Sequence, residues 1–175
     1  LTSIVEITGH SIVLRPVLLG GLFRHHNTGQ QPSSEWGTEK RKIKENDLKR
    51  ALLKSGTRLM PPAQHPRRTV DAMRLLVACP ENKKTELTQR LYEAYWQENK
   101  DISSATVLNE IASTMGLPRD LFHTGEAREG LYESTQKAAE KGIFGVPTFA
   151  VKDHIWWGQD RINLVVDRLV SAPPS

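Results

Sequence analysis

The sequence predicts an α/β protein in which one long helical stretch interrupts a smaller unit that contains the strands. Apolar residues recur with the period of a helix through the middle of the chain, from about residue 40 to residue 141. Short runs of strand length lie only before and after that stretch. With 175 residues, of which 38% are hydrophobic, the chain can bury one sizeable core. We therefore expect one compact protein with a large helical insertion.

The N-terminal part predicts one strand and then a loop. Residues 12–14 are apolar and mostly β-branched, which favours a buried strand. Pro16 ends that strand because proline cannot donate to a sheet ladder. Residues 20–36 contain glycines, a proline, serines and two adjacent histidines with little periodicity, which is typical of a loop.

The middle of the chain predicts a series of helices. Residues 40–53 combine dense charge with a few spaced apolar residues, the pattern of a helix that lies on a surface. Helical periodicity returns in four further segments, at residues 69–78, 85–96, 104–116 and 127–141. Ser104 is a suitable N-cap, and glycines at positions 116 and 142 are typical helix stops.

The period then changes to that of strands. Residues 146–151 and 155–157 are rich in β-branched and aromatic side chains, and a short polar turn separates them, so we expect a β-hairpin. A last helix follows, with Asp160 in position to cap its N-terminus.

Composition excludes several classes of protein. No apolar run approaches the roughly 20 residues that a membrane-spanning helix needs. A single cysteine, Cys79, excludes an intramolecular disulfide framework, a cysteine-rich zinc site and a Cys-x-x-Cys redox pair, and it predicts a reducing compartment. The net charge of +4 is too small to indicate a nucleic-acid partner.

Two other groups of residues are assigned structural roles. The six histidines show neither an i, i+4 pairing with a carboxylate nor a His-Glu-x-x-His pattern, so we predict no metal site. Cys79 lies beside Pro80 with no neighbour that would lower its pKa, so we predict a buried structural thiol.

Three blocks of sequence carry a resemblance to a known family. They are residues 142–149 (GIFGVPTF), 157–161 (WGQDR) and 15–23 (RPVLLGGLF). Together they resemble the kappa-class glutathione transferases and the related bacterial 2-hydroxychromene-2-carboxylate isomerases, and the resemblance covers about residues 10–169.

The resemblance implies a thioredoxin-like domain, related to the DsbA oxidoreductases, that a helical domain splits between its second and third strands. The expected units are a thioredoxin-like domain at residues 1–33 and 134–175 and a helical insertion at residues 34–133. Family members are usually homodimers, so the same partner is expected here.

The resemblance also implies a binding site for glutathione. In the family, a cis-proline begins a strand, and the backbone of the preceding valine pairs with the cysteinyl unit of the ligand. These residues are Val146 and Pro147 here. A cis-proline turns the chain so that the backbone groups before it stay available to a peptide ligand.

Gln159 and Asp160 would hold the γ-glutamyl end, which carries a carboxylate and an ammonium group. The N–H groups of a helix N-terminus suit the carboxylate, and the Asp160 carboxylate suits the ammonium group. The alternative is that Asp160 only caps its helix.

Three further residues are assigned by the same resemblance. Gln30 stands where the family most often has an asparagine that contacts glutathione. Lys40 matches a lysine near an acidic group of the ligand or substrate, although a solvated helix face would explain it equally well. Trp157 is a candidate wall of the substrate pocket, and packing of the hairpin is the alternative.

The catalytic residue of the family has no match in this chain. Family members place a serine at the start of their first helix, where its hydroxyl stabilises the glutathione thiolate. Residues 1–9 resemble only the end of that helix, and Ser3 lacks the strand and proline that would make it a substitute. We therefore assign no catalytic residue and expect the chain to be a fragment of a longer, active protein; a naturally shortened variant is the alternative.

The resulting hypothesis is a glutathione-dependent enzyme, either an isomerase or a kappa-type transferase. The thiolate of its cofactor, glutathione, would attack an electrophilic or unsaturated small molecule. We expect neither a nucleic acid nor a membrane as partner. A DsbA-like thiol-disulfide oxidoreductase and a non-catalytic glutathione-binding protein are the alternatives. The cytoplasm, the mitochondrion and the peroxisome stay open as compartments.

Overall fold

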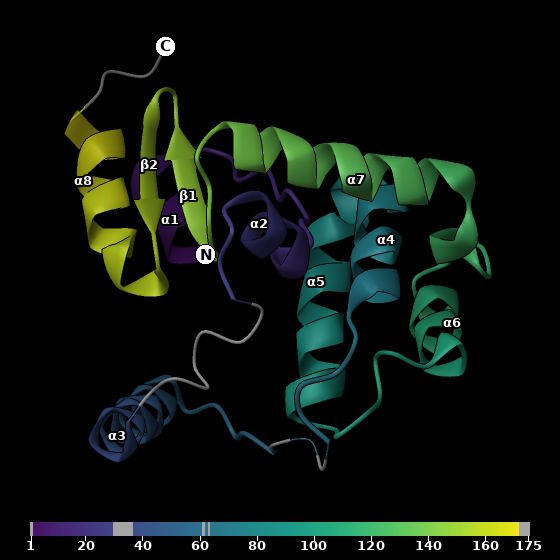
Figure 1. Ribbon diagram of the computed structural model, residues 1–175, viewed down its shortest axis with the longest axis horizontal. Helices are drawn as coiled ribbons and strands as arrows, with labels where there is room; N and C mark the ends of the chain where they lie inside the picture. Colours follow the sequence, from purple (N-terminus) through teal and green to yellow (C-terminus); the bar gives the residue numbers. More distant parts are fainter. Residues whose placement is uncertain (1, 30–36, 61, 63, 172–175) are drawn as a thin grey trace.

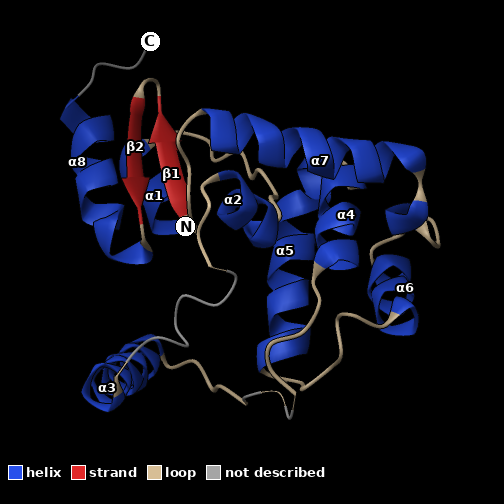
Figure 2. Ribbon diagram, viewed as in Figure 1, coloured by secondary structure: helices blue, strands red, loops and turns tan. Residues whose placement is uncertain are grey.

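The computed structural model describes residues 2–29, 37–60, 62 and 64–171. Its ribbon divides into a hairpin flanked by helices at one end and a cluster of helices at the other, with α7 running from beside the hairpin along the top of the helical cluster (Figure 1). Most of the described residues are helical, and the strands among them pair into one two-stranded antiparallel sheet (Figure 2). None of the described helices is long and apolar enough to cross a membrane.

The predicted hairpin is confirmed. Strands β1 (Thr148–Val151) and β2 (His154–Trp157) pair so that Thr148 faces Trp157. The ladder begins two residues later than expected, because Pro147 has no N–H to donate and Val146 makes no hydrogen bond with the residues described. The short helix η3 (Gln159–Arg161) and α8 (Ile162–Ser171) follow β2.

One face of α8 is buried against α1 (Thr2–Thr8). Val165 of α8 and Ile4 of α1 are each 3% exposed. The predicted last helix is therefore confirmed, but its expected cap is wrong. Asp160 lies inside η3, and Gly158 stands at the cap position without a side chain that could cap.

The expected strand at residues 12–14 is wrong. The segment between α1 and α2 has no regular secondary structure, and its residues 9–16 alternate between exposed and half-buried, yet it forms no ladder with β1 or β2. Two side chains of α7 hold its end instead. The Ser134 hydroxyl donates to the Pro16 carbonyl at 2.7 Å, and the Leu18 N–H donates to the Thr135 hydroxyl at 3.0 Å.

The loop expected at residues 20–36 begins with a helix, α2 (Leu19–His25). Its glycines suggested a loop, but Gly21 is needed for close packing, since a β-carbon there would lie 2.8 Å from Thr135 Cγ2. Leu22 is fully buried in a cluster with Ala138 and Ala139 of α7. Tertiary contact with α7 therefore overrides the low helix propensity of glycine.

The four helices predicted between residues 69 and 141 are confirmed. They form the second end of the molecule together with a short 3-10 helix, and their bounds are α4 (Val70–Ala78), α5 (Glu81–Trp96), α6 (Ala105–Thr114), η2 (Leu121–His123) and α7 (Gly125–Glu140). The inward faces of α4, α5, α6 and η2 share one apolar core around Phe122, Leu75, Leu87 and Leu108, which are fully buried. Helix α7 packs against α4 and η2. Gly116 and Gly142 follow α6 and α7 with positive φ, as helix stops do.

The predicted charged helix is α3 (Thr38–Ser55). None of its residues is buried, and it stands apart from the other helices in Figure 1. A groove of about 370 Å³ lies between α3 and α5, with Leu48, Leu59, Tyr92 and Trp96 among its lining residues. The expected domain boundaries stay predictions; the one at residue 134 falls within α7.

An ion-pair cluster at the end of α5 gives the fold a predicted acid sensitivity. Arg90 donates to both carboxylate oxygens of Glu98, at 2.7 and 2.9 Å, and Lys100 lies 2.9 Å from the same carboxylate. These hydrogen bonds lower the pKa of Glu98 to about 2, and the interaction with Arg90 has the larger effect. A lowered pKa stabilises the fold above the ordinary carboxyl pKa of 4.5, and that stability is lost as the pH falls toward about 2.

We expect Glu98→Gln to lower the free energy of unfolding at pH 7 by only about 0.5–1 kcal/mol, since the pair is partly solvent-screened. The difference in the free energy of unfolding between the variant and the wild type should shrink as the pH falls from 4.5 to about 2. Urea titrations across that pH range measure it. Glu86→Gln, an exposed position of the same helix, is the control, and a difference that does not change with pH would contradict the assignment.

Candidate functional site

The candidate site is built around residues 143–147, called here the binding arm, which connect α7 to β1. The arm is anchored at its start, where the Ile143 N–H donates to the Ala138 carbonyl at 3.0 Å. It is anchored again by the Thr148 hydroxyl, which donates to the Gly145 carbonyl at 2.6 Å. Val146, which follows the anchored Gly145, is 46% exposed, and the Val146–Pro147 peptide bond is cis.

The backbone of Val146 forms no hydrogen bond with any residue in the described part of the chain. Thr148 and the residues after it are paired with β2, so the free backbone groups lie directly before the ladder. An exposed N–H and C=O in that position can pair with the extended backbone of a peptide ligand.

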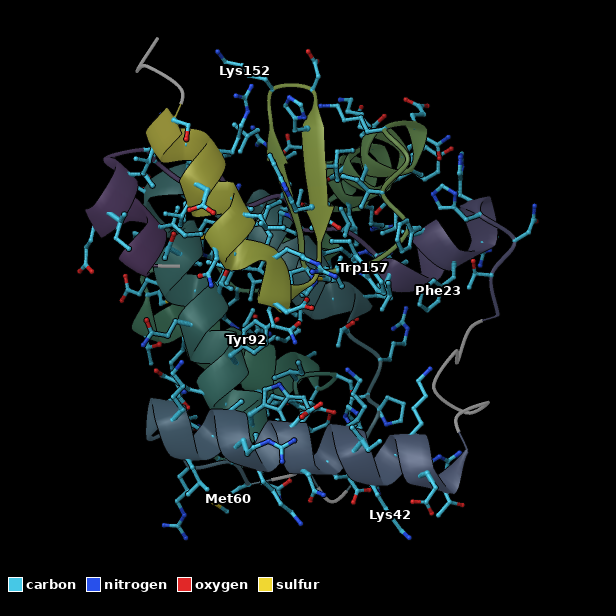
Figure 3. The ribbon with its side chains drawn as sticks, turned by 90° about the vertical axis from the view of Figure 1, so that its left-hand side faces the viewer. Phe23, Lys42, Met60, Tyr92, Lys152 and Trp157 are labelled. Atoms are coloured by element: carbon cyan, nitrogen blue, oxygen red, sulfur yellow. The ribbon has the colours of Figure 1, made fainter. Side chains whose placement is uncertain are left out.

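Two aromatic rings cover the arm. A β-carbon added to Gly145 would lie 2.6 Å from Trp157 Nε1, so the indole rests directly on this buried glycine. The Phe144 ring lies 4.9 Å from the Trp157 ring, at an interplanar angle of 56°. Phe144 and Trp157 remain about half exposed, and they give the site an apolar surface. Figure 3 shows Trp157 at the lower end of the hairpin, opposite the turn at Lys152.

The turn after β2 carries the acidic group of the site. The Gly158 N–H donates to the Pro147 carbonyl at 2.9 Å, which ties this turn to the binding arm. Gly158 has φ 99° and ψ 147°, a conformation that is almost restricted to glycine. An Asp160 oxygen would lie 2.6 Å from a β-carbon at Gly158, so the carboxylate packs against this glycine.

The Asp160 side chain is exposed and is not used by the fold. Its relative exposure is 70%, and its nearest ionic partner is Arg161 Nε at 4.0 Å. It caps no helix, which removes the structural alternative considered for it. A carboxylate in this position can bind an ammonium group beside the open backbone of Val146.

The structure brings five of the predicted site residues into one region, namely Val146, Pro147, Trp157, Gln159 and Asp160. Lys40 lies in the first turn of α3, outside the hairpin and the turn that follows it. Gln30 lies outside the described residues. The binding roles of all seven residues stay predictions.

One residue beside the arm was not identified from the sequence. His26, at the C-terminal end of α2, places Nε2 3.1 Å from the Ile143 carbonyl oxygen. The two residues are 117 positions apart, so no local sequence pattern could reveal the contact.

Cys79 is buried, as predicted, and burial raises the pKa of its thiol despite the nearby Lys84 and Lys83. A thiol with a raised pKa is a poor nucleophile. Among the residues that the structure describes, no three histidine, cysteine or acidic side chains come together as a metal site.

Comparison with known proteins places this geometry in a family. The model of the DsbA-like thioredoxin domain matches residues 1–170. A 2-hydroxychromene-2-carboxylate isomerase of Pseudomonas sp. (strain C18) is 30% identical over 89 residues, which are 47% of this chain and 41% of that protein. The isomerase of the same name from Pseudomonas putida is 32% identical over 81 residues, 43% of this chain and 39% of that protein.

The matches to these curated relatives span only about two fifths of their length. A solved structure of 2-hydroxychromene-2-carboxylate isomerase has the same fold, with a TM-score of 0.81 and 22% identity. That likeness covers 96% of this chain and 84% of the solved chain.

Proposed function

The chain belongs to the family of DsbA-like thioredoxin domains, and on that premise we propose that it is part of a glutathione-dependent enzyme. The named relatives favour an isomerase of 2-hydroxychromene-2-carboxylate type. A kappa-class glutathione transferase is the second form of the proposal, because it would need the same grip on glutathione.

The observation that carries the proposal is the unpaired backbone of Val146. Glutathione is a tripeptide, and its cysteinyl unit offers one N–H and one C=O that match the free groups of Val146. Pairing at Val146 would leave the cysteine sulfur beside the exposed faces of Phe144 and Trp157. An apolar wall of this kind suits a small organic substrate.

Asp160 supplies the second half of the grip. Its exposed carboxylate would accept hydrogen bonds from the γ-glutamyl ammonium group, and neighbouring backbone N–H groups of η3, including that of Gln159, would face the carboxylate. The hydrogen bond between Gly158 and Pro147 keeps this turn close to Val146. The two contacts would therefore hold the middle and the γ-glutamyl end of one extended ligand.

Bound glutathione would supply a thiolate that adds reversibly to an unsaturated acid, which permits rotation about the former double bond before the thiolate leaves. The residues of this chain account for holding and orienting glutathione. None of them matches the family serine that stabilises the thiolate, so this chain's residues are assigned binding roles only.

Calorimetric titration of glutathione into the protein tests the proposal. We expect saturable binding, and we expect Asp160→Asn to raise the Kd about tenfold to a hundredfold by removing a charged hydrogen-bond acceptor. Asp167→Asn, at an exposed position of α8, is the matched control and should bind as the wild type does.

A second ligand isolates the contact with the γ-glutamyl group. Cysteinylglycine lacks that group, so Asp160→Asn should leave its weaker affinity unchanged. No saturable glutathione binding by the wild type would overturn the proposal. Binding without turnover of an unsaturated acid would instead favour a glutathione-binding protein that lacks catalysis.

A further inference from the structure

Helix α2 is fixed rigidly on α7. The Leu18 N–H is bound by the Thr135 hydroxyl, and Gly21 packs against the methyl group of the same threonine. Leu22 is fully buried between the two helices. The C-terminal end of α2 is therefore held in a defined place, and His26 occupies that end.

His26 reaches from this support to the first residue of the binding arm. Its Nε2 lies 3.1 Å from the Ile143 carbonyl oxygen. A carbonyl oxygen only accepts hydrogen bonds, so Nε2 carries the hydrogen and donates it. The Ile143 N–H is already bound by Ala138, so both backbone polar groups of Ile143 are held.

The orientation of the Ile143 carbonyl group determines the orientation of the next peptide N–H. The Ile143 carbonyl and the Phe144 N–H belong to one planar peptide unit, so the direction of the first sets the direction of the second. In the described part of the chain no hydrogen bond engages the N–H of Phe144, Gly145 or Val146. The main chain of the arm is therefore oriented by its ends and by the Thr148 contact at the Gly145 carbonyl.

We propose that His26 is a positioning residue, which orients the main chain of the binding arm by donating a hydrogen bond to the Ile143 carbonyl. The inference rests on the proposed function in so far as the arm binds glutathione. His26 itself contacts the arm and has no assigned contact with the ligand.

Four single variants test this role. His26→Leu removes the donor, and His26→Gln keeps a donor N–H at a similar reach. His25→Leu makes the same change at the neighbouring, exposed histidine. Thr135→Val removes the hydroxyl that binds Leu18, so it loosens α2 without touching the arm.

We expect His26→Leu to raise the Kd for glutathione about threefold to tenfold, the effect of one hydrogen bond, and His26→Gln to restore most of the affinity. His25→Leu should leave the Kd unchanged. Thr135→Val should lower the Tm at least as much as His26→Leu does, but it should raise the Kd by less, because it loosens the support of His26 and keeps the donor itself. An equal rise in Kd for Thr135→Val and His26→Leu would overturn the proposal, because general loosening of α2 would then explain it.

A measurement without ligand separates this inference from the proposed function. The amide NMR signals of Phe144 and Gly145 should shift in His26→Leu and stay in place in His25→Leu. Unchanged signals in His26→Leu would overturn the positioning role, whether or not glutathione binds. Absence of saturable binding by the wild type would overturn the proposed function, while the amide shifts would still test the contact between His26 and the arm.

Discussion

Replacing Gly158 by alanine is expected to lower the affinity for glutathione at least tenfold, and to destabilise the fold. The backbone at Gly158, with φ 99° and ψ 147°, is almost closed to residues that have a β-carbon. Forcing alanine into it costs about 1–3 kcal/mol. The new β-carbon would also lie 2.6 Å from an Asp160 oxygen, so the carboxylate has to move away from its present position.

The two effects of Gly158→Ala can be separated with a matched glycine. Gly56 also has a positive φ, of 67°, but a β-carbon there would meet no atom within 4 Å. Gly56→Ala should therefore lower the Tm through backbone strain alone and leave the Kd for glutathione unchanged. Calorimetric binding and thermal unfolding of both variants measure this. A wild-type Kd in folded Gly158→Ala would contradict the role given to the Asp160 carboxylate.

Much of the fold could be predicted from local patterns. The helices α4 to α7 follow from apolar periodicity and from the glycines that end them, and the hairpin follows from a change of period after residue 142. Those signals lie within each segment, so no knowledge of neighbours is needed. The failed predictions concern segments whose structure is decided by a distant partner.

Residues 12–14 and α2 show this dependence. A strand is defined by its ladder, and the segment before α2 has the expected alternation without a partner strand among the described residues. The glycines of α2 indicated a loop because their purpose, close approach to Thr135, is 114 positions away in the sequence and becomes visible only in three dimensions. Both errors reflect tertiary contacts that a local pattern does not contain.

The candidate site is predictable to the extent that one hairpin builds it. Pairing of Thr148 with Trp157 brings the arm next to the turn at Gly158, so residues about ten positions apart must become neighbours. His26 was missed because its partner, Ile143, is 117 positions away in the sequence. Lys40 lies on α3, and the sequence of that helix does not indicate where the helix lies relative to the hairpin.

Replacing Gly145 by alanine is expected to weaken glutathione binding with little loss of stability. The added β-carbon would lie 2.6 Å from Trp157 Nε1 and 3.3 Å from Cε2, so the indole must leave its place on the binding arm. Overpacking costs about 1–3 kcal/mol where the neighbours cannot move. Trp157 is 55% exposed and can rotate toward solvent, so the loss of stability should fall at the lower end of that range.

The position of the indole decides the expected effect on binding. Trp157 covers Gly145, which precedes Val146, and a displaced ring would either block the open backbone groups of Val146 or remove the apolar surface beside them. We expect the Kd for glutathione to rise about tenfold, which corresponds to about 1.4 kcal/mol. Trp157→Ala combined with Gly145→Ala removes the clash, so the double variant should show no further loss beyond that of Trp157→Ala alone.

Gly130 offers the control, because a β-carbon there would be crowded to the same degree but at the contact of α7 with α4, outside the binding arm. A β-carbon at Gly130 would be 2.7 Å from Val77 Cγ1, where α7 crosses α4. Gly130→Ala should therefore lower the Tm more than Gly145→Ala does and leave the glutathione affinity unchanged. The opposite pattern, with binding lost in Gly130→Ala and kept in Gly145→Ala, would mean that packing of α7 and not the Trp157 cover shapes the site.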